Sequence, residues 1–317
     1  MPLALKLPLA CWFFAISVQA LRKRDARLLK LLIVSTTCVC GVALVGVALT
    51  IAARHTAKYD LWLYSADTAL GAPSFMLARL LRVGAFYHML VVVYEAMPMT
   101  LLLVYAAHLL RNGTPERVLA AFVLNFGVGY SIYLLLPACG PAYAFPSFPA
   151  GTAGVPALHT LNLLAPPNCM PSLHTSTALL ACWFCRPWRL AHSAAWLNLI
   201  LTVLATIATG EHYIVDLVVA APFTAFVYTA SRRRVRPAAA WLGAVLAWCA
   251  MLRFGLAWIT AAPGGFLCVC VATVAAAWLY SWHLDTVAQT GRVGLSGEPA
   301  VASVNQKEYC GMSRAQG

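Results

Sequence analysis

The sequence predicts an all-α, polytopic membrane protein with about eight transmembrane helices. Of its 317 residues, 62% are hydrophobic and only 10% are charged, whereas a soluble globular chain carries about 25% charged residues. The mean hydropathy is correspondingly high, at +0.77. Apolar residues gather in runs of roughly the 20 residues that a helix needs to cross a bilayer. The alternating pattern of a transmembrane barrel is absent, so we expect helices, which satisfy their own backbone amides in lipid.

The predicted spans cover residues 29–52, 85–109, 118–136, 172–190, 193–210, 212–230, 239–260 and 264–282. We expect the first six, within 29–230, to form a core, and residues 231–283 to add two accessory spans. Residues 284–317 turn polar and indicate a flexible cytoplasmic tail. Residues 1–28 indicate a cytoplasmic or interfacial segment. Its apolar stretch 7–20 ends in Val18-Gln19-Ala20, so an interfacial helix, a cleaved signal peptide and an extra span all stay open.

The basic residues predict the orientation. The net charge is +12, but the charges lie beside apolar runs, which indicates membrane topology rather than nucleic-acid binding. If these clusters are cytoplasmic, both ends of the chain are inside and the loops near 54–84, 137–171, 210–211 and 261–263 face outward. We therefore expect an integral protein of the plasma (inner) membrane. The clusters are Arg22–Arg24, Arg111 with Arg117, Arg186 with Arg189, and Arg232–Arg234 with Arg236.

Two of the outward segments carry structural signals of their own. In the first, Arg79 and Arg82 are three residues apart, which predicts an amphipathic surface helix over 75–82 or a simple extension of the second span. The segment 137–171 is rich in Pro and Gly and cannot be a regular span. Long structured loops are often functional. Cys139 and Cys169 lie in this loop and could form a disulfide in an oxidising compartment.

Two polar clusters at the outward ends of spans indicate a catalytic site. Pro171-Ser172-Leu173-His174-Thr175 opens the fourth span, and Gly210-Glu211-His212-Tyr213-Ile214-Val215-Asp216 opens the sixth. Ionisable groups in a membrane are costly and often functional. His212 and Asp216 are four apart and would share a helical face, so the carboxylate could accept a proton from one ring nitrogen and leave the other as a nucleophile. His174 could protonate a leaving oxygen.

Phosphate is the natural ligand for this arrangement. Pro171 suits the first turn of a helix, whose free amides form an anion site with the hydroxyls of Ser172 and Thr175. Glu211 is either solvated or hydrogen-bonded to a sugar or polyol hydroxyl. Glu95, within the second span, either forms a polar wall of the substrate cleft or bonds to a partner within the protein, Asn125 or Tyr133.

Segments 171–174 and 212–216 resemble the second and third signature motifs of the type-2 phosphatidic acid phosphatase superfamily, and more closely its inositol phosphorylceramide synthase branch. The resemblance covers residues 85–230 and implies that His212 attacks phosphorus to form a phosphohistidine, that Asp216 orients it, and that His174 protonates the departing group. It also implies that no metal or other cofactor is needed. The substrate-binding residues expected on this basis are Ser172, Thr175, Gly140, Pro141, Tyr143, Tyr213 and Glu211.

The chain departs from the phosphatases of that superfamily in its cations. Those phosphatases carry Lys and Arg in the first motif, where this chain has the segment 136–143. They also carry an Arg six residues before the third-motif His, where this chain has Thr206. Other residues would have to supply the charge, the candidates being Arg54, Lys58, Arg79, Arg82 and His159. The departure favours a lipid phosphotransferase that moves a phospho-alcohol head group from a phospholipid or lipid phosphate to a lipid or polyol acceptor. The alternatives are a lipid or polyprenyl phosphate phosphatase, a transporter, and a non-catalytic scaffold.

Overall fold

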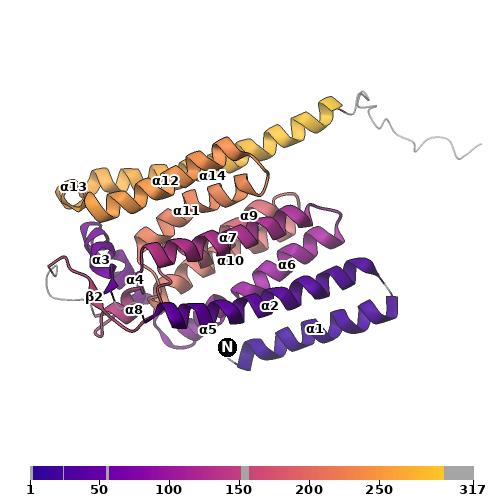
Figure 1. Ribbon diagram of the computed structural model, residues 1–317, viewed down its shortest axis with the longest axis horizontal. Coiled ribbons are helices and arrows are strands. Elements are labelled where there is room, and N and C mark those ends of the chain that lie inside the picture. Colours follow the sequence, from indigo (N-terminus) through magenta and orange to yellow (C-terminus); the bar gives the residue numbers. More distant parts are fainter. Residues whose placement is uncertain (1–2, 24, 55–56, 151–156, 296–317) are drawn as a thin grey trace, which may run out of the picture.

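The computed structural model describes residues 3–23, 25–54, 57–150 and 157–295, which are helical almost throughout. Long helices lie side by side as a bundle, and the short elements α3, α4, α8 and β2 gather at one end of it (Figure 1). The elements are α1 (Leu3–Lys23), α2 (Ala26–Ala52), β1 (Ala57–Lys58), α3 (Asp60–Ala69), α4 (Pro73–Leu81), α5 (Gly84–Glu95), α6 (Met97–Leu110), α7 (Pro115–Leu135), α8 (Pro141–Ala144), β2 (Leu161–Asn162), α9 (Leu173–Cys185), α10 (Arg189–Thr209), α11 (Ile214–Ala230), α12 (Val235–Phe254), α13 (Leu256–Ala261) and α14 (Pro263–Leu295).

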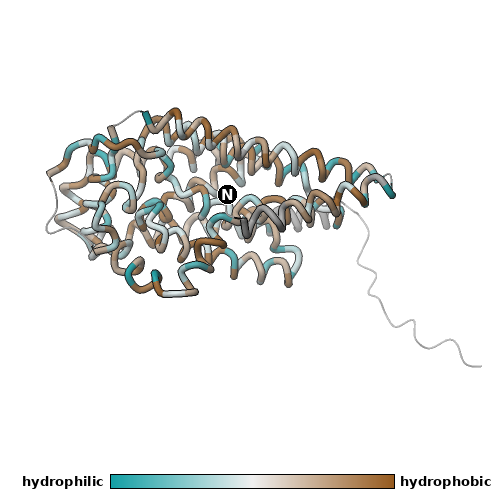
Figure 2. Tube along the Cα trace, turned by 90° about the horizontal axis from the view of Figure 1, so that it is seen from below, coloured by the Kyte–Doolittle hydropathy of each residue, from teal (hydrophilic) through white to brown (hydrophobic). Residues whose placement is uncertain are grey.

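The structure confirms an all-helical, polytopic membrane protein. Within the described chain, α2, α7, α10, α12 and α14 are each long and apolar enough to cross a membrane, and α4 with α5 forms a sixth candidate that is bent by 116°. Hydrophobic residues follow these long helices (Figure 2). The other predicted runs fall on the shorter apolar helices α6, α9 and α11. The second predicted span is divided at Ala96, because Pro98 in the first turn of α6 cannot continue the hydrogen bonding of α5.

Helices α9 and α11 lie at the centre of the bundle. Helix α9 packs against α6, α7, α10 and α11, and α11 packs against α7, α9, α12 and α14. Nearly every side chain of both helices is buried, so their polar groups are shielded from lipid. Ser176 donates to Asn125 at 2.6 Å and accepts from Thr224 at 2.9 Å, which satisfies these groups inside the bundle. The two histidine motifs therefore open the two most enclosed helices.

The N- and C-terminal segments are more helical than the sequence predicted. Helix α1 packs along α2, and Trp12 donates to Ser35 across the pair at 3.2 Å (Figure 1). Helix α14 continues through residue 295, past the predicted start of the tail at residue 284. Asp285 anchors this extension, because it accepts from Arg186 at 2.7 Å and from Tyr228 at 2.7 Å. Residues 296–317 lie outside the described part of the chain.

Helix α4 is bent sharply relative to α5, so it does not continue the second span as one straight helix. Its two arginines bind main-chain carbonyls elsewhere in the fold. Arg79 donates to the carbonyls of Pro149 and Ala150, and Arg82 donates to the carbonyl oxygens of Ala208 at 2.7 Å and Thr209 at 2.9 Å. These bonds hold α4 against the loop and against the end of α10 that precedes His212.

Candidate active site

His212 lies just outside α11 with its ring fixed by the main chain. Tyr213 is the N-cap residue, so the helix begins only at Ile214. The Nδ1 atom of His212 lies 2.6 Å from the carbonyl oxygen of Cys169. A carbonyl only accepts, so Nδ1 carries the proton and the lone pair is on Nε2. The side chain is 1% exposed, and its Nε2 has no hydrogen-bond partner among the described residues. An imidazole held in this tautomer presents a free nucleophilic nitrogen.

Asp216 is close to His212 but does not take its Nδ1 proton directly, contrary to our expectation. Its Oδ2 atom lies 3.8 Å from Nδ1, within ion-pair distance only. The same oxygen accepts from the Tyr213 amide at 2.7 Å, which caps the helix as the acidic residue of a capping box does. The expectation assumed that both residues were helical, whereas His212 precedes the helix. The carboxylate therefore caps α11 and lies beside the imidazole at the same time.

Cys169 connects these two groups. Its carbonyl accepts from His212, and its thiol donates to Oδ2 of Asp216 at 2.7 Å. Burial raises the pKa of this thiol, and the nearby carboxylate of Asp216 raises it further, so the sulfur keeps its proton. The disulfide to Cys139 is not formed: both cysteines are free, and the Cys139 thiol donates to Asp60 at 3.4 Å. The sequence analysis did not identify Cys169 as part of the site.

His174 faces His212 from the first turn of α9. The two ring centroids are 6.2 Å apart, with the rings inclined by 62°. The ring of Tyr94, at the end of α5, stacks on His174 with centroids 3.8 Å apart and an angle of 17°. Tyr94 was also missed, because nothing in the sequence relates the end of α5 to the start of α9. The structure thus brings the two predicted histidines together and covers one face of His174 with an aromatic ring.

Ser172 and Thr175 form the N-terminal cap of α9. Ser172 Oγ accepts from the Thr175 amide at 3.3 Å, and the two hydroxyls bond to each other at 3.0 Å. The Ser172 amide also donates to the main-chain oxygen of Asp216 at 3.3 Å, which ties the start of α9 to the first turn of α11. Both side chains are buried beside His174. In this structure the two hydroxyls are hydrogen-bonded to each other, and that of Ser172 also caps the helix.

The predicted first-motif loop packs directly on the segment before His212. Gly140 has a φ of +89°, and a Cβ there would lie 2.3 Å from the carbonyl oxygen of Glu211, so only glycine fits. The next residue, Pro141, begins α8, and the Ala142 amide donates to the carbonyl of Gly210 at 2.9 Å. The loop therefore reaches the active-site segment through main-chain contacts.

Glu211 bonds within the protein and is not simply solvated. Tyr143 donates to its Oε1 at 3.0 Å, and Asn168 donates to its Oε2 at 3.0 Å. Tyr143 is 41% exposed at the rim of the site. Glu95 is exposed at the end of α5 and does not bond to Asn125, nor to Tyr133, whose hydroxyl donates to the carbonyl of Pro171 at 2.9 Å. The expected bond of Glu95 to Asn125 or Tyr133 is therefore wrong, and its role as a polar wall of the substrate cleft stays a prediction.

Two buried carboxylates of α3 organise the site and were missed from the sequence. Asp60 accepts from the Gly140 amide at 2.9 Å and from the Tyr213 hydroxyl at 3.2 Å. Tyr213 is fully buried and its hydroxyl is used in this bond, so its predicted contact with substrate stays a prediction. Asp67 accepts from the Ser74 hydroxyl at 2.6 Å. Burial raises the pKa of each carboxyl to about 6. Their spacing of seven residues, which places both on one helical face, was an available signal.

The candidate cations are distributed around the site. Arg79 and Arg82 bind the main-chain carbonyls described above. His159 lies on an exposed part of the loop and contacts the carbonyl of Ala157 at 2.7 Å. Arg54 is exposed at the end of α2, and Lys58 is buried in β1 near Asp60. Thr206, at the position of the phosphatase arginine, is buried and bonds to the carbonyl of Val203 at 2.8 Å.

Potential metal-ligand atoms of Cys169, His212 and Asp216 lie within 4.8 Å of one another. The thiol proton and the Nδ1 proton are already used in hydrogen bonds within this group. A metal ion on the sulfur would have to displace the Cys169 proton, and with it the hydrogen bond to Asp216.

Comparison with known proteins identifies the family. A family model of the PAP2 superfamily matches residues 61–230, which include α3, the loop, and both histidine motifs. This is a superfamily of membrane phosphatases and phosphotransferases. Searches among curated proteins and among solved structures gave no match. Since the match covers more than half of the 317 residues, the chain belongs to the PAP2 superfamily.

Proposed function

We propose that this protein is a lipid phosphotransferase of the inositol phosphorylceramide synthase type, which moves a phospho-alcohol head group between lipids through a phosphohistidine on His212. The observation that supports this most strongly is the state of the His212 ring. Its Nδ1 is fixed on a carbonyl, and its buried Nε2 has no partner within the described chain. An unpaired buried nitrogen is costly unless a ligand meets it, and the ring centroid of His174 lies 6.2 Å from that of His212.

In the first half-reaction, Nε2 of His212 attacks phosphorus and a P–N bond forms. The bond from phosphorus to the ester oxygen of the donor lipid breaks, and protonated His174 gives its proton to that oxygen. In the second half-reaction, the acceptor hydroxyl gives its proton to neutral His174 while its oxygen attacks phosphorus. The P–N bond then breaks and His212 returns to its starting state. This sequence uses one histidine as nucleophile and the other as acid and then base.

Asp216 and Cys169 stabilise the charge that develops on His212. The imidazole becomes cationic when Nε2 is phosphorylated, and the carboxylate 3.8 Å from Nδ1 offsets that charge. The Cys169 thiol holds the carboxylate in position by its hydrogen bond. The first-turn amides of α9, with Ser172 and Thr175, are the groups we assign to the phosphoryl oxygens. No step requires a metal ion.

The acceptor side of the site lies at Glu211 and Tyr143. Because Tyr143 is exposed and bonded to Glu211, an incoming hydroxyl can replace that bond with one to the carboxylate. The basic clusters favour a site on the outer face of the membrane, and we assign the protein to the plasma membrane. Hydrolysis of a lipid or polyprenyl phosphate would use the same first half-reaction with water as acceptor, so the acceptor dependence decides between the two activities.

The test is a product assay with the full-length protein in detergent. The purified protein is incubated with radiolabelled phospholipids and lipid phosphates, with and without a long-chain alcohol acceptor. His212→Ala is the inactive variant, and His283→Ala, an exposed histidine of α14, is the matched control. Labelled lipid product that requires the acceptor, is absent in His212→Ala and persists in His283→Ala establishes transfer. Release of phosphate without acceptor dependence assigns a phosphatase, and no turnover of any substrate overturns both.

A further inference from the structure

A basic cavity is lined by residues at the start of α7 and between α11 and α12. In Figure 1 these segments lie at the end of the bundle opposite α3, α4 and α8. The volume of the cavity is about 460 Å³. A second cavity of about 500 Å³ shares Thr114, Arg117 and Arg232 with it, so the two adjoin. Volumes of this size are typical of small-molecule sites. The proposed phosphotransfer uses none of these residues.

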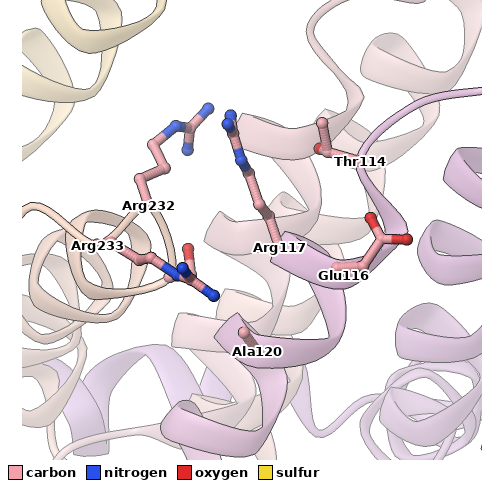
Figure 3. Close-up of a pocket in the computed structure, with 7 residues that line it drawn as sticks. Thr114, Glu116, Arg117, Ala120, Arg232 and Arg233 are labelled. Carbon is pink, nitrogen blue, oxygen red and sulfur yellow. The ribbon is translucent and has the colours of Figure 1, made fainter.

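The charge in this region exceeds what the protein itself neutralises. Figure 3 shows Arg232 and Arg233 extending from the turn toward Arg117 on α7. Asp285 pairs with Arg186 at 2.7 Å and Arg232 at 2.8 Å. Arg117 and Arg233 form no ion pair with any carboxylate of the described residues, and neither does Arg111 in the adjoining cavity. Five arginines thus face two carboxylates, Asp285 and Glu116.

Two buried donors in the region also lack partners. The Nη1 atom of Arg232 and the Nε atom of Arg186 are buried without a hydrogen-bond partner among the described residues. The Arg232 side chain is only 15% exposed, and that of Arg186 is 8% exposed. Leaving a charged donor unpaired in a buried position is costly. These unpaired donors belong to two arginines that line the cavities, so an anion there would offset their positive charge.

The backbone at Arg233 is held in a conformation that favours glycine. Its φ is +58°, its amide donates to the carbonyl of Ala230 at 2.8 Å, and the Arg234 amide donates to the carbonyl of Thr229 at 3.1 Å. This is the Schellman pattern, in which the left-handed position is usually glycine. An arginine there is less stable than glycine, and such exceptions often mark functional positions. Membrane topology requires only positive charge near this end, so it does not explain an arginine at this position.

We infer that this cavity binds a phosphate group, carried by an anionic lipid head group or by a soluble phosphate ester. Arginine guanidinium groups bind phosphate oxygens through paired hydrogen bonds, and three of them converge on the first cavity. Tryptophans border the second cavity: Arg111 lies 5.4 Å from the ring of Trp188, and Arg186 lies 4.8 Å from that of Trp282. Tryptophan is enriched at head-group depth, which places the opening where a lipid phosphate lies.

The experiment uses the full-length protein and four forms: wild type, Arg233→Gly, Arg234→Gln and His212→Ala. Arg233→Gly removes a lining cation and puts the preferred residue in the left-handed position, so the variant folds at least as well as wild type. Arg234 is also exposed but does not line the cavity, which makes Arg234→Gln the matched charge control. One arm measures phosphatidylglycerol retained from phosphatidylcholine nanodiscs by native mass spectrometry. The other measures the thermal shift produced by glycerol phosphate.

We expect Arg233→Gly to weaken binding about tenfold in at least one arm, with Arg234→Gln and His212→Ala unchanged. Loss confined to the lipid arm identifies a head group, and loss confined to the soluble arm identifies a free ester. Equal binding by wild type and Arg233→Gly overturns the inference, as does equal loss in Arg234→Gln. Loss in His212→Ala places the phosphate in the active site and also overturns it. Since transfer is assayed separately, failure of the proposed function leaves this test intact.

Discussion

The main-chain carbonyl oxygen of Cys169 lies 2.6 Å from Nδ1 of His212. This bond sets the tautomer of the proposed nucleophile, and it comes from a loop residue rather than from the carboxylate of Asp216. The thiol of the same cysteine donates to that carboxylate at 2.7 Å. One residue at the end of the loop therefore positions both the imidazole and the acid beside it.

Removing the Cys169 thiol should reduce catalysis more than stability. Cys169→Ala leaves the carbonyl bond to His212 in place but removes one donor from Asp216, and a hydrogen bond to a charged group contributes about 1.5–3 kcal/mol. We expect kcat to fall about tenfold with little change in KM. Cys169→Ser restores a donor and should recover most of the activity. Equal kcat values for Cys169→Ala and wild type would show that the thiol has no positioning role.

The substitution Asp216→Asn distinguishes the helix-capping role of Asp216 from the role of its negative charge. The amide oxygen can still accept from Tyr213 and Cys169, so the melting temperature in detergent should stay close to that of wild type. The negative charge near His212 is lost, and we expect kcat to fall about 100-fold, or roughly 2.7 kcal/mol in the barrier. Asp216→Ala should additionally lose the cap and about 1 kcal/mol of stability. The account is contradicted if Asp216→Asn turns over at the wild-type rate.

Gly140→Ala tests the close packing of the loop on the active-site segment. The added Cβ would lie 2.3 Å from the Glu211 carbonyl, at a φ of +89°. We expect a loss of several degrees in melting temperature and loss of activity, because the loop must move away from the segment before His212. Gly127→Ala in α7, where a Cβ meets open space, should be neutral or stabilising. Similar behaviour of the two variants would mean that this loop packing is unimportant.

The buried carboxyls of α3 predict a specific pH dependence of stability. Burial raises the pKa of Asp60 and Asp67 from 3.8 to about 6 in the folded protein. The folded state therefore binds protons at these two carboxyls more tightly than the unfolded state does. Their protonation contributes fully to the free energy of unfolding below about pH 4, and this contribution is lost as the pH rises through about 6. The pKa shift of each carboxyl corresponds to roughly 3 kcal/mol in the free energy of unfolding. Thermal unfolding of wild type and Asp67→Asn over this range should give a shallower dependence in the variant; parallel curves would contradict the assignment.

The fold class was predicted correctly because it depends on local patterns, and the two histidines that the structure brings together were found from local motifs. Apolar runs of span length and the positions of the Pro-Ser-Leu-His and His-Tyr-Ile-Val-Asp segments are read directly from neighbouring residues. The division of the second span at Ala96 followed from Pro98, which was visible but was not used. Helix α14 exceeds its predicted length because Asp285 bonds to Arg186, just after α9, and to Tyr228 of α11. Such a partner is evident only in three dimensions.

The supporting residues of the site were harder to predict. Cys169, Tyr94 and Asp60 each act through contacts between segments that are distant in the sequence. Tyr213 was expected among the substrate-binding residues, and the structure makes it the N-cap residue of α11. Its hydroxyl meets Asp60 inside the fold. A helix start that lies two residues later than expected was enough to alter the role of Asp216.

The most direct test of the central claim is to trap the phosphoenzyme. Wild type, His174→Ala and His212→Ala are incubated with a lipid substrate labelled at phosphorus, quenched in alkali, and analysed by mass spectrometry for the modified peptide. The account predicts an acid-labile label on His212, which is absent in His212→Ala and slower to form in His174→Ala because the leaving oxygen then lacks its proton donor. Label on another residue, or equal labelling of His212→Ala, would contradict it.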